Sequence, residues 1–205
     1  MIILTNESVM NFENAIRGMR NPLNSWDKSD SGYCADDGLY ILGNSDFELA
    51  VKLCKSGSDH RKFLRQIIVS IDITAPMYWW KEFDTYKVGT VANSCSTMHT
   101  IHKKEFELSD FSVERMTLGT METFKCVIDT LEWNRNKFNE TKDKAYWDNM
   151  IQLLPMSYNQ MRTVTLNYEV LRNMYHSRKN HKLEEWRNFC KWVEQLPYAY
   201  ALIIR

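Results

Sequence analysis

The chain has 205 residues, of which 44% are hydrophobic and 25% are charged, a composition typical of a folded globular protein. Lys plus Arg number 26 and Asp plus Glu number 26, so the formal net charge is zero, and no overall field would attract a nucleic acid or an acidic membrane surface. No apolar run approaches the roughly 20 residues that a transmembrane helix needs.

The cysteines and the opening residues both indicate a cytoplasmic protein. The five cysteines lie far apart, without a C-x-x-C pair, which argues against a disulfide framework and against a zinc site. The first residues, MIILTNES, lack the basic segment and the long apolar stretch of a signal peptide. We therefore expect reduced cysteines, a cytoplasmic location and no bound metal ion.

The N-terminal part predicts little regular structure. Residues 1–4 are β-prone, and residues 5–8 offer capping side chains for a helix that runs through residue 16. Residues 18–43 are rich in Gly, Asn, Asp and Ser, so we expect a long loop or an irregular insertion. Residues 46–55 then predict a helix that ends near Gly57.

Residues 66–97 carry the clearest local pattern. Val69, Ile71 and Ile73 alternate with polar residues, and this period of two predicts a strand with one buried face. Pro76 has no amide donor and suits the exit from a strand into a first helical turn. Residues 77–83 predict a short apolar helix, and the small residues 90–97 predict a loop or an edge strand.

The C-terminal half predicts helices. Residues 118–137, 145–154 and 183–196 have apolar side chains at helical spacing. Ser157 and Gln160 form an S-x-x-Q pattern, which predicts the start of one helix over residues 158–178. With no repeat or linker in view, we predict a single domain, residues 1–205, of the α+β class with a helical C-terminal half.

The predicted helix over residues 158–178 carries polar groups at informative positions. Asn167 and Arg178 are 11 residues apart, so they would project from nearly the same face, while Asn173 would lie about 120° away. This spacing alone also fits an amphipathic surface helix with solvated polar side chains.

The order of these motifs resembles the flavin-dependent thymidylate synthases, the ThyX family. In that family a strand ends in Ala-Pro, a helix carries an Arg-His-Arg triplet, and an Asn-Glu-Leu-Ser-x-Arg loop follows. Here Ala75-Pro76, the aromatic helix, Asn93 and Ser96 match this frame. Further along, Leu154-Pro155, Asn167, Leu171, Asn173 and Arg178 fall in register with a second family pattern.

Several of the family's chemical groups are replaced in this sequence. The triplet is Thr85-Tyr86-Lys87, and the loop Glu and Arg are Ser94 and Met98. Glu82 stands for a Gln, Met161 stands for a phosphate-binding Arg beside Arg162, and Glu169 stands for another Arg. These changes remove about three to four positive charges, each of which contributes roughly 1.5–3 kcal/mol to phosphate binding through charge-assisted hydrogen bonds.

The resemblance implies a fold, an activity and a set of site residues. The fold is a curved antiparallel sheet flanked by helices, in a homotetramer with clefts shared between subunits. The activity is the reductive methylation of dUMP or a related pyrimidine nucleotide toward dTMP, a methyltransferase reaction that uses FAD, methylene-folate and NADPH. By resemblance, Arg178 is the catalytic residue, and Glu82, Ser94, Ser96, Arg162 and Arg178 bind substrate. The cofactor-binding residues implied are Tyr86, Lys87, Asn93, Asn167 and Asn173.

Two alternatives remain open at the level of sequence. A non-catalytic nucleotide-binding protein that has lost flavin chemistry is favoured by the altered triplet and by Met98 in the loop. A purely structural oligomer would leave Arg178 without a role in binding.

Overall fold

A computed structural model describes all 205 residues of the chain. It is of the α+β class with an antiparallel sheet and helices, as the sequence predicts. The helices are α1 (Phe12–Arg20), α2 (Asn44–Lys55), α3 (Met77–Phe83), α4 (Thr97–Thr100), α5 (Leu118–Thr141), α6 (Lys144–Leu153), α7 (Tyr168–Arg178) and α8 (Glu184–Val193). The strands are β1 (Ile3–Met10), β2 (Gly32–Tyr33), β3 (Tyr40–Ile41), β4 (Ile68–Pro76), β5 (Val91–Ser94) and β6 (Asn159–Asn167). None of the helices combines the length and the apolar character that spanning a bilayer requires.

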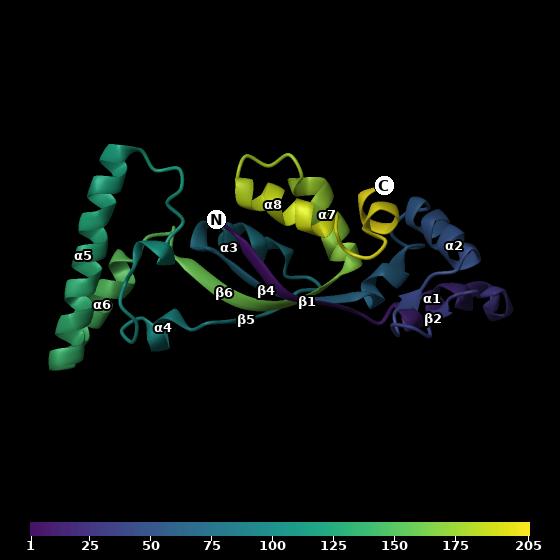
Figure 1. Ribbon diagram of the computed structural model, residues 1–205, viewed down its shortest axis with the longest axis horizontal. Helices are drawn as coiled ribbons and strands as arrows, with labels where there is room; N and C mark the ends of the chain where they lie inside the picture. Colours follow the sequence, from purple (N-terminus) through teal and green to yellow (C-terminus); the bar gives the residue numbers. More distant parts are fainter. The chain divides into compact units, whose positions relative to one another are not determined.

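The chain folds into two compact units, each made of three separate segments. Unit 1 comprises Met1–Ile3, Ile73–Thr85 and Asn93–Thr163. Unit 2 comprises Leu4–Asp72, Tyr86–Ala92 and Val164–Arg205. Figure 1 colours the chain along its sequence and labels the elements of both units.

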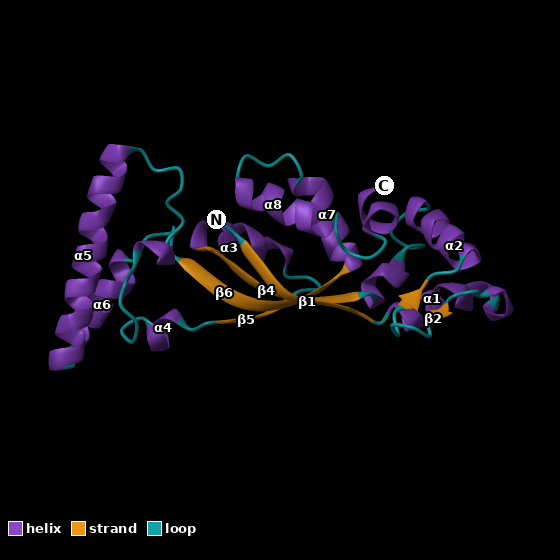
Figure 2. Cartoon of the chain, viewed as in Figure 1, coloured by secondary structure: helices purple, strands orange, loops and turns teal.

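The main sheet has four strands in the order β1-β4-β6-β5 (Figure 2). Beside one end of β4, the Tyr168 amide donates to the Ile67 carbonyl at 3.1 Å, and beside the other end the Met77 amide donates to the Tyr158 carbonyl at 3.0 Å. Residue numbers rise along one strand as they fall along the other, so β4 and β6 are antiparallel. Residues 90–97, predicted as a loop or an edge strand, include β5 (Val91–Ser94), which lies at the edge of the sheet.

The alternation in β4 has the predicted effect on burial. Val69, Ile71 and Ile73 are at most 1% exposed, whereas the polar residues between them are partly exposed. The strand ends at Pro76 and α3 begins at Met77, as expected for a proline that cannot donate to the sheet.

The predicted single helix over residues 158–178 is wrong. Residues 159–167 form β6, and the helix begins only at Tyr168. Val164 and Leu166 are buried while the threonines on either side of Val164 are exposed, which is the period of a strand. The S-x-x-Q pattern caps nothing: the Ser157 hydroxyl has no hydrogen-bond partner, and the Gln160 side chain donates to the Cys95 carbonyl.

The N-terminal prediction is also corrected. Residues 5–8 lie inside β1 and do not cap a helix. The first helix, α1, begins at Phe12 after Asn11, which adopts a left-handed φ of 71°, a conformation that Asn tolerates better than most residues. The Gly18–Gly43 region, expected as a loop, contains the end of α1, two 3-10 turns and the paired strands β2 and β3.

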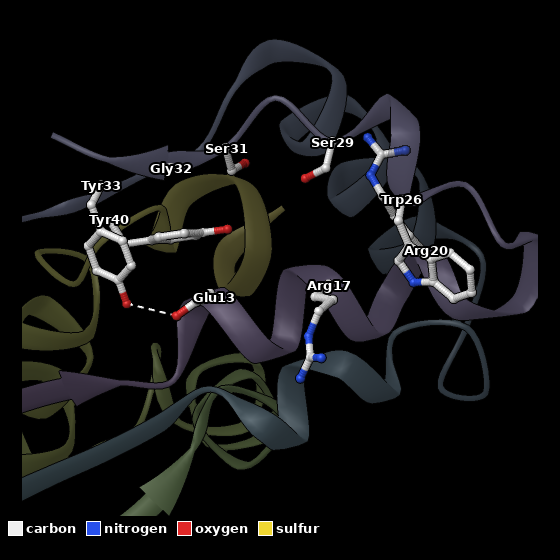
Figure 3. A pocket seen from close by; sticks show the side chains of 9 residues that line it. All are labelled: Glu13, Arg17, Arg20, Trp26, Ser29, Ser31, Gly32, Tyr33 and Tyr40. Carbon is white, nitrogen blue, oxygen red and sulfur yellow. Dashed lines mark hydrogen bonds between the residues drawn. The ribbon is translucent and has the colours of Figure 1, made fainter.

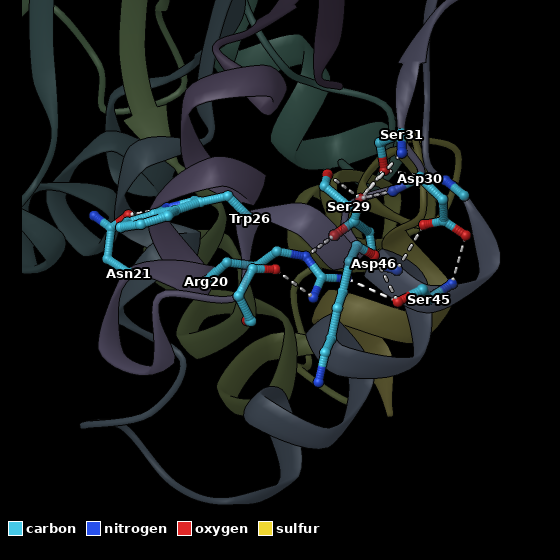
Figure 4. Close-up of polar contacts among 11 residues, drawn as sticks. Arg20, Asn21, Trp26, Ser29, Asp30, Ser31, Ser45 and Asp46 are labelled. Carbon is cyan, nitrogen blue, oxygen red and sulfur yellow. Dashed lines mark hydrogen bonds and ion pairs between the residues drawn. The ribbon is translucent and has the colours of Figure 1, made fainter.

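A fully buried carboxylate, Asp46, fixes this irregular region (Figure 4). The Asp46 carboxylate accepts hydrogen bonds from Arg20 and from the hydroxyls of Ser29 and Ser31. It also accepts the backbone amides of residues 30 and 31, both at 3.1 Å. In return, Asp30 accepts the Ser45 and Asp46 amides at the start of α2. A segment with little apolar content is therefore held by hydrogen bonds.

Each unit has its own apolar packing. In unit 1, α5 and α6 pack side by side (Figure 1). The buried apolar cluster of this unit consists of Ile101, Phe106, Phe111, Phe124, Leu131 and Met150. In unit 2, α7 packs against α8 and against the C-terminal π-helical turn Tyr200–Ile204. Burial of such apolar side chains supplies the main driving force for folding.

Candidate functional site

Arg178, at the last position of α7, is held by two aromatic side chains. Its Nε donates to the Tyr86 hydroxyl at 2.9 Å. The guanidinium carbon lies 4.9 Å from the centre of the Trp186 ring and 5.5 Å from that of Tyr86, within range of cation–π attraction. Trp186 is fully buried and meets Tyr86 edge to face at 6.0 Å. The predicted catalytic arginine is therefore fixed in direction, although it is only partly buried.

The turn that follows Tyr86 lies against the start of α7. Gly89 has a φ of +85°, and a Cβ there would lie 3.0 Å from Val170 and 3.1 Å from the Asn167 amide nitrogen. Asn167 is the N-cap of α7, because its Oδ1 accepts the Val170 amide at 3.0 Å. Asn167 thus has a structural role that fixes the helix on which Arg178 lies.

Arg162, in unit 1, has its own set of partners. Its Nη1 donates to Asp84 and its Nε to Gln160, both at 3.0 Å, and the guanidinium lies 4.2 Å from the Trp80 ring centre. Gln160 also donates to the carbonyl of Cys95 at 2.9 Å. Arg162 therefore ties β6 to the end of α3, and Gln160 ties β6 to the segment after β5. Its predicted role in substrate binding stays a prediction.

Glu169, which replaces a family arginine, forms an ion pair in unit 2. Arg61 donates to both carboxylate oxygens, with distances of 2.9 to 3.1 Å. The hydrogen bond to Glu169 raises the pKa of Arg61. Because Glu169 lies in the first turn of α7, its negative charge also suits the positive end of the helix dipole. The negative charge of Glu169 is thus balanced by Arg61.

The remaining predicted residues are more exposed. Asn93 and Ser94 lie on β5, and Asn173 lies on the outer face of α7. The Ser96 hydroxyl caps α4 by accepting the His99 amide at 3.2 Å. Glu82 is half-buried on α3, and its carbonyl accepts the Thr85 hydroxyl at 2.7 Å.

The replaced triplet does not fit the diphosphate of FAD as three cationic or imidazole groups would. The Thr85 hydroxyl donates to a backbone carbonyl, and the Tyr86 hydroxyl accepts from Arg178. Lys87, which is exposed, is the one cation that the triplet offers. A diphosphate is usually held by several charge-assisted hydrogen bonds, and this triplet supplies one such donor.

The buried cysteines do not suit nucleophilic catalysis. Burial raises the pKa of Cys54 to about 11 and that of Cys190 to about 12. The thiolate is the reactive form, so both side chains stay protonated at neutral pH. Arg178 and Arg162 can instead position a ligand and stabilise its negative charge.

Trp186, Gln160 and Asp84 are site residues that sequence reasoning missed. Trp186 lies 100 residues along the chain from Tyr86, and no local spacing connects the two. The S-x-x-Q pattern predicts a helix cap at Gln160. In the strand that forms instead, residues two apart share a face, so Gln160 lies beside Arg162.

Comparisons with solved structures find the same fold over the whole chain. The flavin-dependent thymidylate synthase ThyX of Helicobacter pylori, complexed with FAD and dUMP, has a TM-score of 0.68 and 20% identity, and the match covers 98% of this chain and 97% of that one. A second structure of ThyX from Helicobacter pylori with FAD and dUMP has a TM-score of 0.68 and 19% identity, covering 98% of this chain and 96% of that one.

A third similar structure is the UMP/dUMP methylase PolB of Streptomyces cacaoi bound with 5-Br dUMP. Its TM-score is 0.62 at 14% identity, and the match covers 98% of this chain and 93% of that one. No protein-family profile matches the sequence, and a search of curated proteins finds no match either. The chain therefore has the ThyX fold, as the sequence motifs predict.

Proposed function

We propose that this protein binds a pyrimidine nucleotide, dUMP or a close relative, with Arg178 as the anchor. The observation that carries the proposal is the guanidinium of Arg178, fixed by the Tyr86 hydroxyl and the Trp186 ring. A planar arginine fork that is held in place can bind a phosphate or the edge of a uracil with two parallel hydrogen bonds. Full-length likeness to proteins bound with dUMP or 5-Br dUMP supports the same ligand class.

Fixing Arg178 in advance would strengthen binding. A free arginine side chain loses about 2 kcal/mol of rotamer entropy when it is immobilised, and the contacts with Tyr86 and Trp186 reduce that loss before the ligand arrives. Tyr86 thus acts as a positioning residue for Arg178, in place of the flavin contact that the resemblance implies.

A second candidate function is flavin-dependent methylation of the nucleotide. It is favoured by the match over 98% of the chain to structures that contain both FAD and dUMP. On this reading the protein would be a cytoplasmic homotetramer that uses FAD, methylene-folate and NADPH, as the resemblance implies. Lys87 and Asn167 would then be among the residues that hold the cofactor.

Titration calorimetry with dUMP tests the role of Arg178. Arg178→Ala should weaken dUMP binding more than tenfold, because it removes a charge-assisted bidentate contact worth about 1.5–3 kcal/mol. Arg178→Lys should bind dUMP nearly as weakly as Arg178→Ala, because lysine keeps the charge but lacks the planar fork. Lys179→Ala removes a neighbouring exposed cation and should leave binding unchanged. Equal affinity in Arg178→Ala and the parent protein would refute the assignment.

Visible absorbance decides between the two candidate functions. A yellow purified protein would support flavin-dependent methylation, and so would a spectral change on adding FAD that Lys87→Ala weakens. Turnover of dUMP would then be the next assay. If the protein stays colourless with FAD but binds dUMP, nucleotide binding without flavin chemistry is the function.

A further inference from the structure

A depression lies beside α1, among residues that the proposed function does not use. Two adjoining cavities of about 310 and 560 Å³ share Arg17 and Trp26 in their walls. Volumes in this range are typical of small-molecule sites. Figure 3 shows Arg17 on α1 with Glu13 to one side of it and Arg20 and Trp26 to the other, and with its guanidinium pointing away from the helix.

A chain of hydrogen bonds along one face of α1 orients Arg17. The Asn11 side chain donates to the Gln66 carbonyl at 2.9 Å, and the Asn14 amide donates to Asn11 Oδ1 at 2.7 Å. Arg17 Nη2 then donates to Asn14 Oδ1 at 2.9 Å. Residues three apart on a helix are neighbours, so the spacing 11, 14, 17 builds this chain. The hydrogen bond to Asn14 uses one of the five N–H groups of the Arg17 guanidinium.

Trp26 is likewise fixed without being buried. Its Nε1 donates to Asn21 Oδ1 at 2.9 Å, yet the residue is 50% exposed. An exposed indole that a hydrogen bond holds in place presents its face for stacking against a planar ring, an interaction worth about 1–3 kcal/mol for a nucleobase.

Arg17 is the cation that this site has to offer. Arg20 also lines the smaller cavity, but its side chain is 4% exposed and paired with Asp46. Ser29 and Ser31 direct their hydroxyls to the same carboxylate. The polar side chains of Arg20, Ser29 and Ser31 are therefore already hydrogen-bonded to Asp46.

From these contacts we infer that Arg17 and Trp26 form a second binding site, for a ligand of the nucleoside monophosphate class. The phosphate pairs with the Arg17 fork and the planar base stacks on Trp26. Glu13 lies one helical turn before Arg17 and accepts a hydrogen bond from Tyr33. Its negative charge limits the positive potential of the site, so a monophosphate binds better than a triphosphate.

Titration calorimetry with AMP tests this site on the full chain. Arg17→Gln and Trp26→Ala should each weaken AMP binding about tenfold or more, through loss of the phosphate contact and of the stack. Ribose 5-phosphate should lose affinity only in Arg17→Gln, and adenosine only in Trp26→Ala. Lys28→Gln removes an exposed cation of the same segment and should change nothing.

Two results would overturn the inference: no heat with AMP up to millimolar concentration, or AMP affinity that both Arg17→Gln and Trp26→Ala leave unaltered. The Trp26 indole resonance in a proton–nitrogen spectrum gives an independent readout and should shift on adding AMP. Repeating the dUMP titration of Arg178→Ala in an Arg17→Gln background separates the two sites, so failure of one proposal is distinguishable from failure of the other.

Discussion

At the scale of single residues, the surroundings of each arginine decide what it can do. Arg162 and Arg61 pair with carboxylates of their own unit, and the Tyr86 hydroxyl and the Trp186 indole orient Arg178. From the sequence, Arg178 is predicted as a site residue and this stays a prediction, whereas Glu169 appears there only as the replacement of an arginine. Its partner Arg61 lies 108 residues away, and no pattern in the sequence connects them.

The Arg61–Glu169 pair should be worth measuring. Glu169→Gln is expected to lower the free energy of unfolding by about 1.5–3 kcal/mol, because hydrogen bonds to charged groups contribute that much and both side chains are at most 19% exposed. Urea denaturation of Arg61→Met, of Glu169→Met and of the double variant Arg61→Met/Glu169→Met gives the coupling energy. A coupling near zero would mean that the pair adds nothing to stability.

Asp46 predicts a pH dependence of stability. Burial acts to raise the pKa of its carboxyl, but the hydrogen bonds from Ser31, Ser29 and Arg20 outweigh burial and hold it below its usual range. Stability from this group is therefore fully present above the unfolded pKa of about 3.9 and is lost as the pH falls through the lower folded value.

Urea midpoints measured from pH 6 down to pH 2 check this prediction. The parent protein should lose stability below about pH 4, and Asp46→Asn should show a shallower loss because it has no carboxyl to protonate. Asp27→Asn, at an exposed position, is the matched control and should follow the parent curve. Parallel curves for Asp46→Asn and the parent would contradict the assignment.

At the scale of elements, local patterns predicted those parts of the fold whose side chains alternate or repeat clearly. The strand β4 and the helix α3 follow from the β-branched alternation and from Pro76. The strand β6 did not, since Met161, Val164 and Leu171 also fit a helical period. Residues 159–167 form a strand because their backbone pairs with β4, and this long-range contact overrides local propensity.

Gly89 provides a test of how the turn after Tyr86 meets α7. Gly89→Ala should lower stability by about 1–3 kcal/mol, because an alanine at a left-handed φ is strained and its Cβ would lie 3.0 Å from Val170. Displacing the Asn167 cap should weaken dUMP binding as well. Gly119→Ala, where a Cβ meets nothing within 4 Å, should be neutral or stabilising by up to about 1 kcal/mol. Thermal melts of both variants give the comparison.

At the scale of the whole molecule, the two units are linked by repeated chain passages. Each unit has three segments that alternate along the sequence, so the chain passes between the units five times. We expect one cooperative transition, with equal calorimetric and van't Hoff enthalpies. Two resolved transitions in a calorimetric scan would count against the prediction of a single domain.

The interleaved segments also restrict how such a protein can be recombined. Any single crossover between residues 4 and 163 with a relative of the same fold would give both units mixed parentage. Neither unit can be exchanged as a cassette, so a chimera inherits mismatched packing partners on both sides of the join.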